Sequence, residues 1–308
     1  MKLSFVIPAF NEEENIQVIY KRLITLTDKY SEMDYEIIFI NDGSADKTLS
    51  ILKGLSEKNK KLKYIDLSRN FGHQAALWAG LLHASGDAII SLDCDLQDPP
   101  ELIEQMIAKW QDGFEVVYAR RLNFRDDSFM KKIGSKIYYK LLDQITNIDI
   151  PQNVGDFRLI DKKVLKELYR MKERSKYIRG MVAWTGFKSS FVDYERPDRE
   201  KGTSKYTIRK LIGLAISGMM NFSHIPLKLG LYMGVVSIIS GFFLLGYQLV
   251  DVVVNDAYYH LYKWLVVVIF IFTGFLFMLI WILGEYIARI YDEIRDRPLF
   301  VARDKINF

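Results

Sequence analysis

Cysteine and histidine are scarce in this chain. Its 308 residues include one cysteine, Cys94, and four histidines. A single cysteine excludes an internal disulfide, and no paired Cys/His spacing indicates a zinc site. No G-x-G-x-x-G pattern follows the first apolar run, which disfavours a dinucleotide site of that type. The net charge is only +4. The basic residues are clustered, and such a local basic surface fits binding of phosphate or anionic lipid better than binding of nucleic acid.

Long uncharged runs are confined to the last third of the chain. Residues 229–250 and 264–284 each lack a charge over about 20 residues, the length needed to cross a bilayer core. Basic residues precede the first run and follow the second, while the loop between them carries Asp251 and Asp256. The positive-inside rule therefore predicts a hairpin of two spans with both flanks in the cytoplasm.

The first two thirds alternate short apolar runs with amphipathic segments. Runs such as LSFVIPAF, EIIFI and AIISL are apolar on both faces, which indicates a doubly wound α/β fold with a mostly parallel sheet. The first run is broken by Pro8 and followed by acids, so we interpret it as a strand and not a signal peptide. After Arg121 the pattern changes to a basic helix, a loop containing GDFRL and a strand-like FKSSFVDYERP.

These patterns predict four segments. An α/β domain occupies 1–210, and the two spans lie within 225–288, followed by a cytoplasmic tail at 289–308. Residues 211–224 suit an amphipathic helix at the membrane surface, although a core helix of the soluble domain fits equally well. The expected location is the cytoplasmic membrane, with the α/β domain facing the cytoplasm.

Two aspartates close the apolar run AIISL. Ligand sites in parallel α/β sheets lie beyond the carboxyl ends of the strands, and residues two apart on a strand share a face. Asp93 and Asp95, with Gln97 one step further, are therefore expected to converge on a divalent cation, Mg²⁺ or Mn²⁺, that binds a diphosphate. The alternative, a carboxylate that caps the helix starting near Pro99, fits Asp98 better.

Four motifs, in this order and spacing, resemble those of the family 2 glycosyltransferases. They are VIPAFNEEENI, NDGSADKT, RNFGHQAALWAGL and LDCDLQDPPE. The likeness is greatest to the polyprenyl-phosphate, dolichol-phosphate mannose synthase-like branch, and the two C-terminal spans resemble bacterial undecaprenyl-phosphate glucosyltransferases. The resemblance covers about Lys2 to Lys210 and implies a GT-A fold with a divalent metal.

The resemblance also implies roles for individual residues. By this resemblance Asp95 and Gln97 bind the metal, and Asp93 and Asp156 have catalytic roles. The nucleotide-sugar positions are Pro8, Phe10, Glu12, Asp42, Asp93, Cys94 and Arg121. The acceptor-phosphate positions are Lys131, Ser135 and Arg199, with Lys205 as a further candidate.

Several of these positions have a second interpretation. The side chain of Cys94 is expected to point into the sheet as a small apolar group. Asp156 is explained equally well as a loop acid paired with Arg158. Asp42 also fits an Asx-turn, and each basic residue taken singly also fits a solvated surface charge. The family often has arginine where Lys131 stands, which puts a bidentate contact there in doubt.

The expected reaction is inverting transfer of glucose from UDP-glucose to undecaprenyl phosphate. Donors with GDP-mannose or a UDP-amino-pentose remain open. A processive polysaccharide synthase is disfavoured because the chain lacks Q-x-x-R-W and has two expected spans. An alternative of another class is a non-catalytic scaffold or flippase anchor. Gly230, Gly234 and Gly241 would permit close packing of spans in a homo-oligomer.

Overall fold

The computed structural model describes two separate parts of the chain. The described residues are 1–30, 32–122, 151, 153–173, 176–195 and 261–308, with isolated residues between 236 and 254. By internal contacts the chain divides into two compact units, and the first unit contains both the N-terminal region and Arg297–Phe308. The predicted interfacial helix, the four acceptor-phosphate positions and most of the predicted first span lie outside the described residues.

The first unit is built on a mixed sheet with eight described strands in the order β7-β5-β6-β4-β1-β2-β3-β8. The strands are β1 (Lys2–Ala9), β2 (Asp34–Asn41), β3 (Leu62–Leu67), β4 (Ala88–Ser91), β5 (Val116–Arg121), β6 (Val154–Asp161), β7 (Ser189–Tyr194) and β8 (Ala302–Ile306). The central strands β1 and β2 are buried over most of their length and mostly apolar, because helices cover both faces of the sheet.

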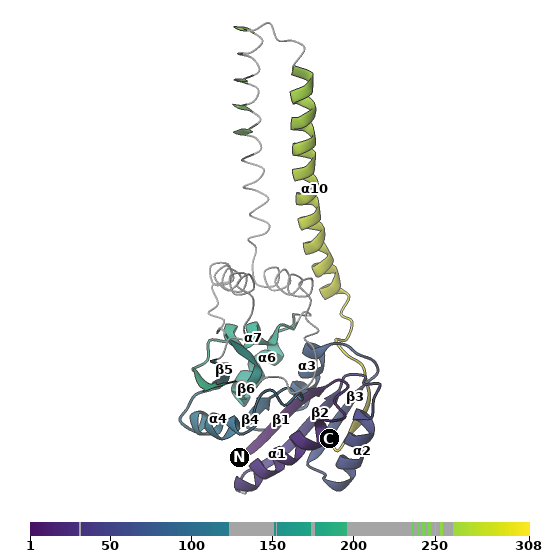
Figure 1. Ribbon diagram of the computed structural model, residues 1–308, viewed down its shortest axis with the longest axis vertical. Coiled ribbons are helices and arrows are strands. Elements are labelled where there is room, and N and C mark those ends of the chain that lie inside the picture. The colour runs from purple at the N-terminus through teal and green to yellow at the C-terminus, as the bar shows by residue number, and fades with distance from the viewer. Residues whose placement is uncertain are drawn as a thin grey trace. The chain divides into compact units, whose positions relative to one another are not determined.

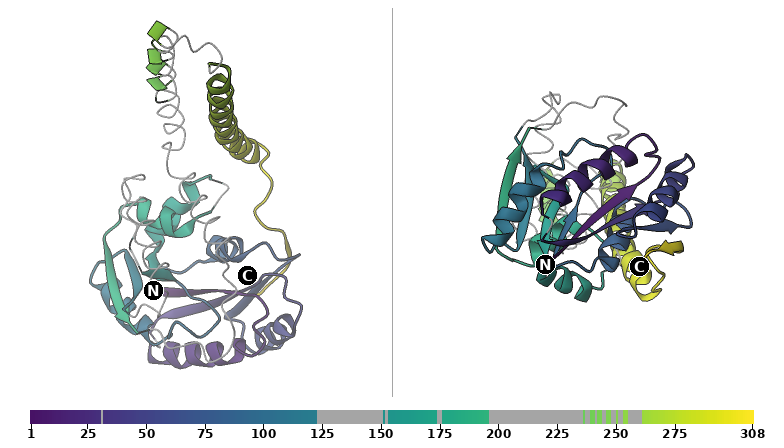
Figure 2. Two further views of the ribbon diagram at one scale, coloured as in Figure 1. Left: turned by 45° about the horizontal axis from the view of Figure 1, so that its top comes forward. Right: turned by 90° about the horizontal axis from the view of Figure 1, so that it is seen from below.

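Helices pack on the two faces of this sheet in two groups. The helices of the unit are α1 (Ile16–Lys29), α2 (Thr48–Lys58), α3 (His73–His83), α4 (Leu102–Gln111), α6 (Lys162–Arg170) and α7 (Ile178–Trp184). The core on one face includes α1, α2 and α4, and that on the other includes α3, α6 and α7. Figure 1 and Figure 2 show this three-layer arrangement, which confirms the predicted α/β fold.

The sheet is less parallel than the sequence predicts. β1 pairs in parallel with β2 and β4, β2 with β3, and β5 with β7. However, β6 lies antiparallel between β4 and β5. The loop predicted around GDFRL is therefore wrong, because those residues form strand β6. A strand that reverses direction here places Asp156 beside the carboxyl end of β4.

The C-terminal residues do not form a separate tail. β8 pairs antiparallel with β3 at the edge of the sheet, and Leu299 and Phe300 pack against the same core as α3 and α7. This pairing fixes the C-terminus to the first unit.

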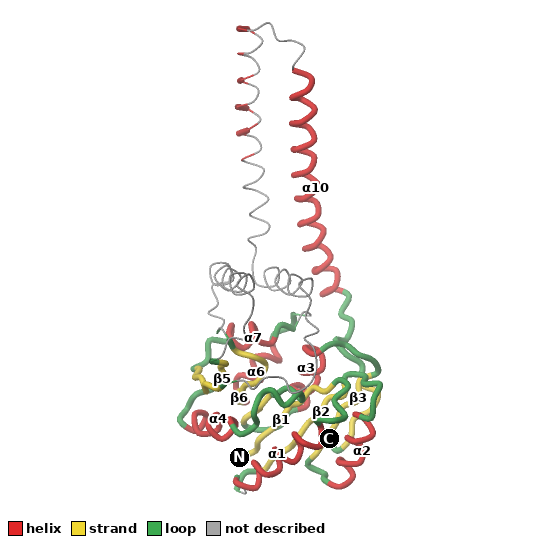
Figure 3. The backbone as a smooth tube through the Cα atoms, viewed as in Figure 1, coloured by secondary structure: helices red, strands yellow, loops and turns green. Residues whose placement is uncertain are grey.

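The second unit contains α10 (Leu261–Ile294), the long helix coloured red in Figure 3. Its segment Ile271–Ile294 is long and apolar enough to cross a membrane. Among the described residues, this is the one helix that meets both criteria. The predicted span at 264–284 lies inside α10.

Candidate functional site

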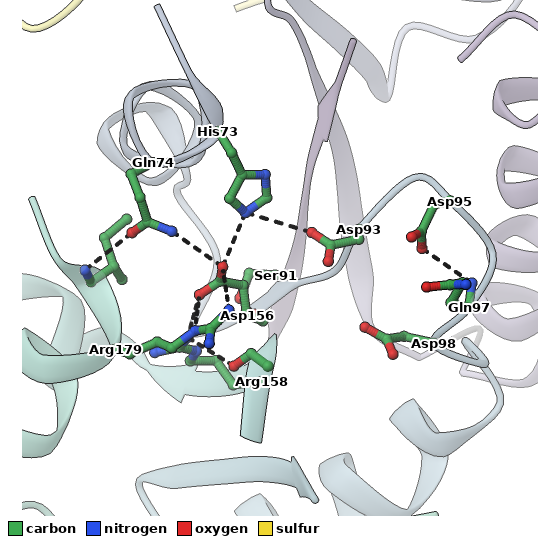
Figure 4. A network of polar contacts seen from close by, with 12 residues as sticks. His73, Gln74, Ser91, Asp93, Asp95, Gln97, Asp98, Asp156, Arg158 and Arg179 are labelled. Carbon is green, nitrogen blue, oxygen red and sulfur yellow. Dashed lines mark hydrogen bonds and ion pairs between the residues drawn. The ribbon is translucent and has the colours of Figure 1, made fainter. Parts of the chain in front are cut away.

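The carboxylate pair lies in a turn and not on a strand. β4 ends at Ser91, and Leu96 adopts a φ of 57°, so the chain reverses between the two aspartates and α4. The expectation that Asp93 and Asp95 share one face of a strand is therefore wrong. Figure 4 shows that Asp93 points toward His73, whereas Asp95 lies beside Gln97, whose backbone nitrogen donates to Asp95 Oδ1 at 3.2 Å.

Asp156 is the centre of a polar cluster that joins three elements. His73 Nε2 from α3 lies 3.0 Å from its Oδ2, and Gln74 Nε2 donates to the same oxygen at 3.2 Å. Arg158 Nη2 donates to Oδ1 at 2.7 Å. Arg179, on α7, donates from Nε to Oδ1 at 3.0 Å and from Nη2 to Oδ2 at 3.1 Å.

These donors fix the protonation state of Asp156. Burial alone would raise the pKa of its carboxyl, but the two arginines and His73 hold that pKa well below the usual range. The lowered pKa favours the ionised carboxylate of Asp156, which makes it a poor proton acceptor. The predicted pairing with Arg158 is present, but in a buried strand and not in a loop.

Asp93 has the opposite electrostatics. Burial, together with the charges of Asp156, Asp98 and Asp95, raises its pKa to about 6, against the attraction of His73. Its Oδ1 lies 3.6 Å from His73 Nε2. His73 thus links the carboxylate turn to the Asp156 cluster, and these two acids raise its pKa against the effect of burial.

The residues of the turn fit a divalent cation. Both amide atoms of Gln97 are buried and have no hydrogen-bond partner in the described part of the chain, an arrangement that costs free energy unless another ligand supplies the contact. A hard cation that takes carboxylate and amide oxygens would supply the contact to Oε1, and an acceptor on the substrate or a water would supply that to Nε2. The described residues hold no group of three or more His, Cys, Asp or Glu side chains arranged for a metal.

Asp42 connects two turns at the predicted donor end of the sheet. Its Oδ1 accepts from the backbone nitrogen of Phe71 at 2.7 Å and its Oδ2 from that of Gly72 at 3.0 Å. Burial raises the pKa of Asp42 even so. These contacts hold the start of α3, and with it His73, against the end of β2.

Arg121 lies at the end of β5, where its Nε donates to the Tyr194 hydroxyl at 2.9 Å and its Nη2 lies 3.4 Å from both carboxylate oxygens of Asp98. Asp98 is fully buried and also accepts from Tyr194. The alternative interpretation, in which Asp98 caps a helix that starts near Pro99, is not met, because α4 begins only at Leu102 with Glu101 at its N-cap.

The remaining predicted positions differ in their access to ligand. Phe10 is 45% exposed just beyond β1, and Glu12 is half-buried with its carboxylate accepting from Asn15. Pro8, by contrast, is buried within β1. Cys94 is also buried in the core, and burial raises the pKa of its thiol well above the usual value. The expectation of an inward-pointing Cys94 is met. Its place among the nucleotide-sugar positions stays a prediction.

Sequence reasoning did not name Gln74 or Arg179. Gln74 Oε1 also accepts from the backbone nitrogen of Ile178 at 3.2 Å, which places the short helix α7. No local pattern marks Arg179, because its contact with Asp156 depends on the packing of α7.

Comparison with known proteins decides the family. Residues 4–169 match the family model described as Glycosyl transferase family 2. The chain belongs to this family. It is a glycosyltransferase, as its motifs indicated.

Two curated relatives match this glycosyltransferase over nearly its full length. A Bacillus subtilis protein named as an uncharacterised glycosyltransferase is 43% identical, covering 98% of this chain and 94% of the relative. An Escherichia coli protein named as a prophage bactoprenol glucosyl transferase homolog is 39% identical, covering 98% and 99%. Among solved structures, mannosyl-3-phosphoglycerate synthase from Rubrobacter xylanophilus is 15% identical with a TM-score of 0.49, covering 72% of this chain and 73% of that one.

Proposed function

We propose that this glycosyltransferase transfers glucose from UDP-glucose to a polyprenyl phosphate such as undecaprenyl phosphate, with inversion. The observation that carries the proposal is the place of Asp93 and Asp95, at the end of β4 and next to a cluster of basic side chains around Asp156. Full-length similarity to proteins named bactoprenol glucosyl transferase supports the lipid acceptor and the glucosyl group. GDP-mannose and UDP-amino-pentose donors are the competing assignments.

The reaction needs an anionic nucleophile and a stabilised leaving group. A phosphate monoester has a second pKa near 6, so it is ionised at neutral pH. One of its oxygens attacks the anomeric carbon, and the bond from that carbon to the donor diphosphate breaks, with the electron pair leaving on the diphosphate. The protein therefore has to position the two substrates more than to remove a proton.

The residues divide between these tasks. Asp95 and Gln97 would hold a divalent cation, Mg²⁺ or Mn²⁺, which when bound neutralises charge on the diphosphate. Asp93, turned toward His73, would contact the donor. The turn held by Asp42, with Phe10 and Glu12, would bind the nucleoside, and Arg121 would contact phosphate.

We also propose a two-span membrane anchor, with spans at about 229–250 and 264–284 and the catalytic domain in the cytoplasm. The apolar surface of α10 supports the second span, since residues such as Phe277 and Trp281 are mostly exposed. Lys131, Ser135, Arg199 and Lys205 remain predicted acceptor contacts. A homo-oligomer formed through the spans remains a prediction.

The test is sugar transfer by the purified full-length protein. Radiolabelled UDP-glucose, a UDP-amino-pentose and GDP-mannose are each incubated with undecaprenyl phosphate and Mg²⁺ or Mn²⁺, and product is counted after organic extraction. We expect transfer from UDP-glucose that EDTA abolishes. Asp95→Ala should reduce transfer by at least a hundredfold, as expected for the loss of electrostatic stabilisation of the leaving group.

A matched control separates this effect from general damage. Asp112 is an exposed carboxylate at the end of α4, so Asp112→Ala should transfer at the wild-type rate. Both variants should unfold at wild-type temperature. Normal turnover by Asp95→Ala would overturn the metal assignment, and no lipid product from any donor would overturn the proposed reaction.

A further inference from the structure

The Asp156 cluster has a buried anion and an accessible cationic face. The side chains of Asp156 and Arg158 are 4% and 2% exposed, so neither meets solvent. His73 and Arg179 are 43% and 35% exposed. A ligand that approaches this cluster therefore meets the imidazole and the guanidinium, while their counterion lies behind them.

The guanidinium of Arg179 is held in a fixed plane. Its Nε and Nη2 donate to the two different oxygens of Asp156, a bidentate arrangement that restricts rotation of the group. Gln74 bonds both to Asp156 and to the first residue of α7. The helix that carries Arg179 is thus fastened to the same carboxylate as the side chain.

A second guanidinium lies next to this cluster. A Cβ atom at Gly155 would lie 2.8 Å from Arg121 Nη2, so Arg121 passes directly over the residue before Asp156. Asp98 and Tyr194 raise the pKa of Arg121 against the effect of burial, and the charge of Arg179 opposes that rise. The two cations are therefore close enough to act on each other. Each already has one carboxylate partner, Asp98 for Arg121 and Asp156 for Arg179, and a phosphate that carries two negative charges can bind both guanidinium groups.

We propose that Arg179, together with Arg121, binds the phosphate monoester of the lipid acceptor. In this proposal Asp156 is a positioning residue that orients Arg179. The inference rests on the proposed function and assigns to that site a contact that the sequence motifs do not indicate. A guanidinium has five N–H donors in one plane. Asp156 accepts from the edge of Arg179 formed by Nε and Nη2, so phosphate would be bound from another edge of the same rigid group.

Asp156 acts through Arg179 and takes no proton. Its carboxylate oxygens already accept from two arginines, Gln74 and His73, and the acceptor needs no base. A guanidinium fixed by this carboxylate instead holds the attacking oxygen at one distance from the anomeric carbon. The contact therefore acts mainly on binding of the acceptor, in the orientation that attack requires.

The experiment measures steady-state kinetics with the two substrates varied separately. Arg179→Lys keeps the positive charge but loses the fork, and Arg179→Ala loses both. We expect the acceptor KM to rise at least tenfold in Arg179→Lys and further in Arg179→Ala. The KM for UDP-glucose and the dissociation constant of UDP, measured by calorimetry, should change less than twofold.

The matched control is Arg170→Ala. Arg170 is 76% exposed on α6 and pairs only locally, with Glu167, so its removal should leave both KM values unchanged. If Arg179→Ala fails to fold, Arg179→Lys decides the matter alone. An unchanged acceptor KM in Arg179→Lys, or a rise confined to the donor KM, would overturn the proposal; the second result would assign Arg179 to the donor diphosphate.

Asp156→Asn tests the positioning role. An asparagine still accepts a hydrogen bond but cannot bind the guanidinium with two anionic oxygens. We expect a raised acceptor KM, with kcat at saturating acceptor within tenfold of wild type and an unchanged pH profile of kcat. A loss of kcat that acceptor concentration does not relieve, together with a loss of its acidic limb, would instead make Asp156 the base. If the wild-type protein does not glycosylate the lipid at all, the proposed function itself is wrong, and the assignment of Arg179 is wrong with it.

Discussion

The backbone nitrogen of Ser68 donates to the carbonyl oxygen of Val301 at 2.8 Å. This bond joins the end of β3 to the residue before β8. Further along, Asn307 Nδ2 donates to the backbone oxygens of Ser56 and Leu62 at 3.0 Å and 2.8 Å. The chain therefore leaves the catalytic domain before α10 and is fastened to the same domain after it.

This fastening limits the possible membrane topologies. If α10 crosses a bilayer once, the chain has to cross an odd number of further times between residues 195 and 261, because both flanks belong to one domain. Within that interval the sequence predicts one span, at 229–250. The expected topology is thus a hairpin whose connecting loop, near Asp256, lies on the far side of the membrane.

Thiol labelling tests this topology. Cys94 is buried and its thiol has a raised pKa, so the wild-type protein should react little with a membrane-impermeant maleimide. We expect Asp256→Cys to be labelled in intact cells, and Asp112→Cys, on the exposed surface of the catalytic domain, to be labelled only after lysis. Equal labelling of the two variants in intact cells would contradict the hairpin.

Strands that are mostly apolar are predictable from the sequence, whereas strands that carry charged residues are not. β1, β2 and β4 are recognisable because each is a continuous apolar run. β6 carries Asp156 and Arg158, which are buried as a pair, so its pattern resembles that of a loop although the charges compensate each other. β8 reads ARDKI and has no local signal, because its partner β3 lies more than 230 residues earlier in the chain.

Some residues of the candidate site are also predictable from the sequence, and others are not. The carboxylates at the end of β4 are predictable from their position after an apolar run. The turn that carries them is not, because β4 ends at Ser91, before both aspartates, and the chain reverses at Leu96, whose φ is positive. Arg179 is not predictable either, since tertiary packing brings α7 to Asp156.

Glu36 provides a pH-dependent contribution to stability at the opposite end of the strands. Its carboxylate is 1% exposed and accepts from Lys2 Nζ at 2.9 Å and from Lys63 Nζ at 2.8 Å. Burial opposes ionisation, but these lysines, Ser4 and the Ser85 backbone lower the pKa of Glu36 from 4.5 to about 2. Because the folded-state pKa is depressed, the stabilisation is present above pH 4.5 and is lost as pH falls toward 2.

A shift of this size corresponds to about 3 kcal/mol of unfolding free energy. We expect Glu36→Gln to lower the unfolding temperature markedly at pH 7 and the difference from wild type to shrink as pH falls from 4.5 toward 2. Asp34→Asn, which removes an exposed ion pair with Lys61, is the control and should have little effect. A difference between Glu36→Gln and wild type that stays constant across this pH range would disprove the assignment.

Gly43 allows the turn after β2 to pack directly on the turn before α3. Its φ is 68°, and a Cβ there would meet the backbone of Arg69 and lie 2.5 Å from the nitrogen of Asn70. Those are backbone atoms that a side-chain rotation cannot move. Gly43→Ala therefore has to separate the two turns that Asp42 joins, at a cost of about 1–2 kcal/mol for the left-handed conformation alone and more for the collision.

The expected result is lower thermal stability together with weaker UDP binding, by at least tenfold in calorimetry, because the separated turns form the predicted nucleoside site. Gly54→Ala is the matched control: a Cβ at Gly54 meets nothing within 4 Å in α2, so that variant should gain about 0.5–1 kcal/mol from helix propensity and bind UDP normally. If Gly43→Ala lost stability but kept wild-type UDP affinity, the turn would serve the fold alone, and the nucleoside would have to bind elsewhere.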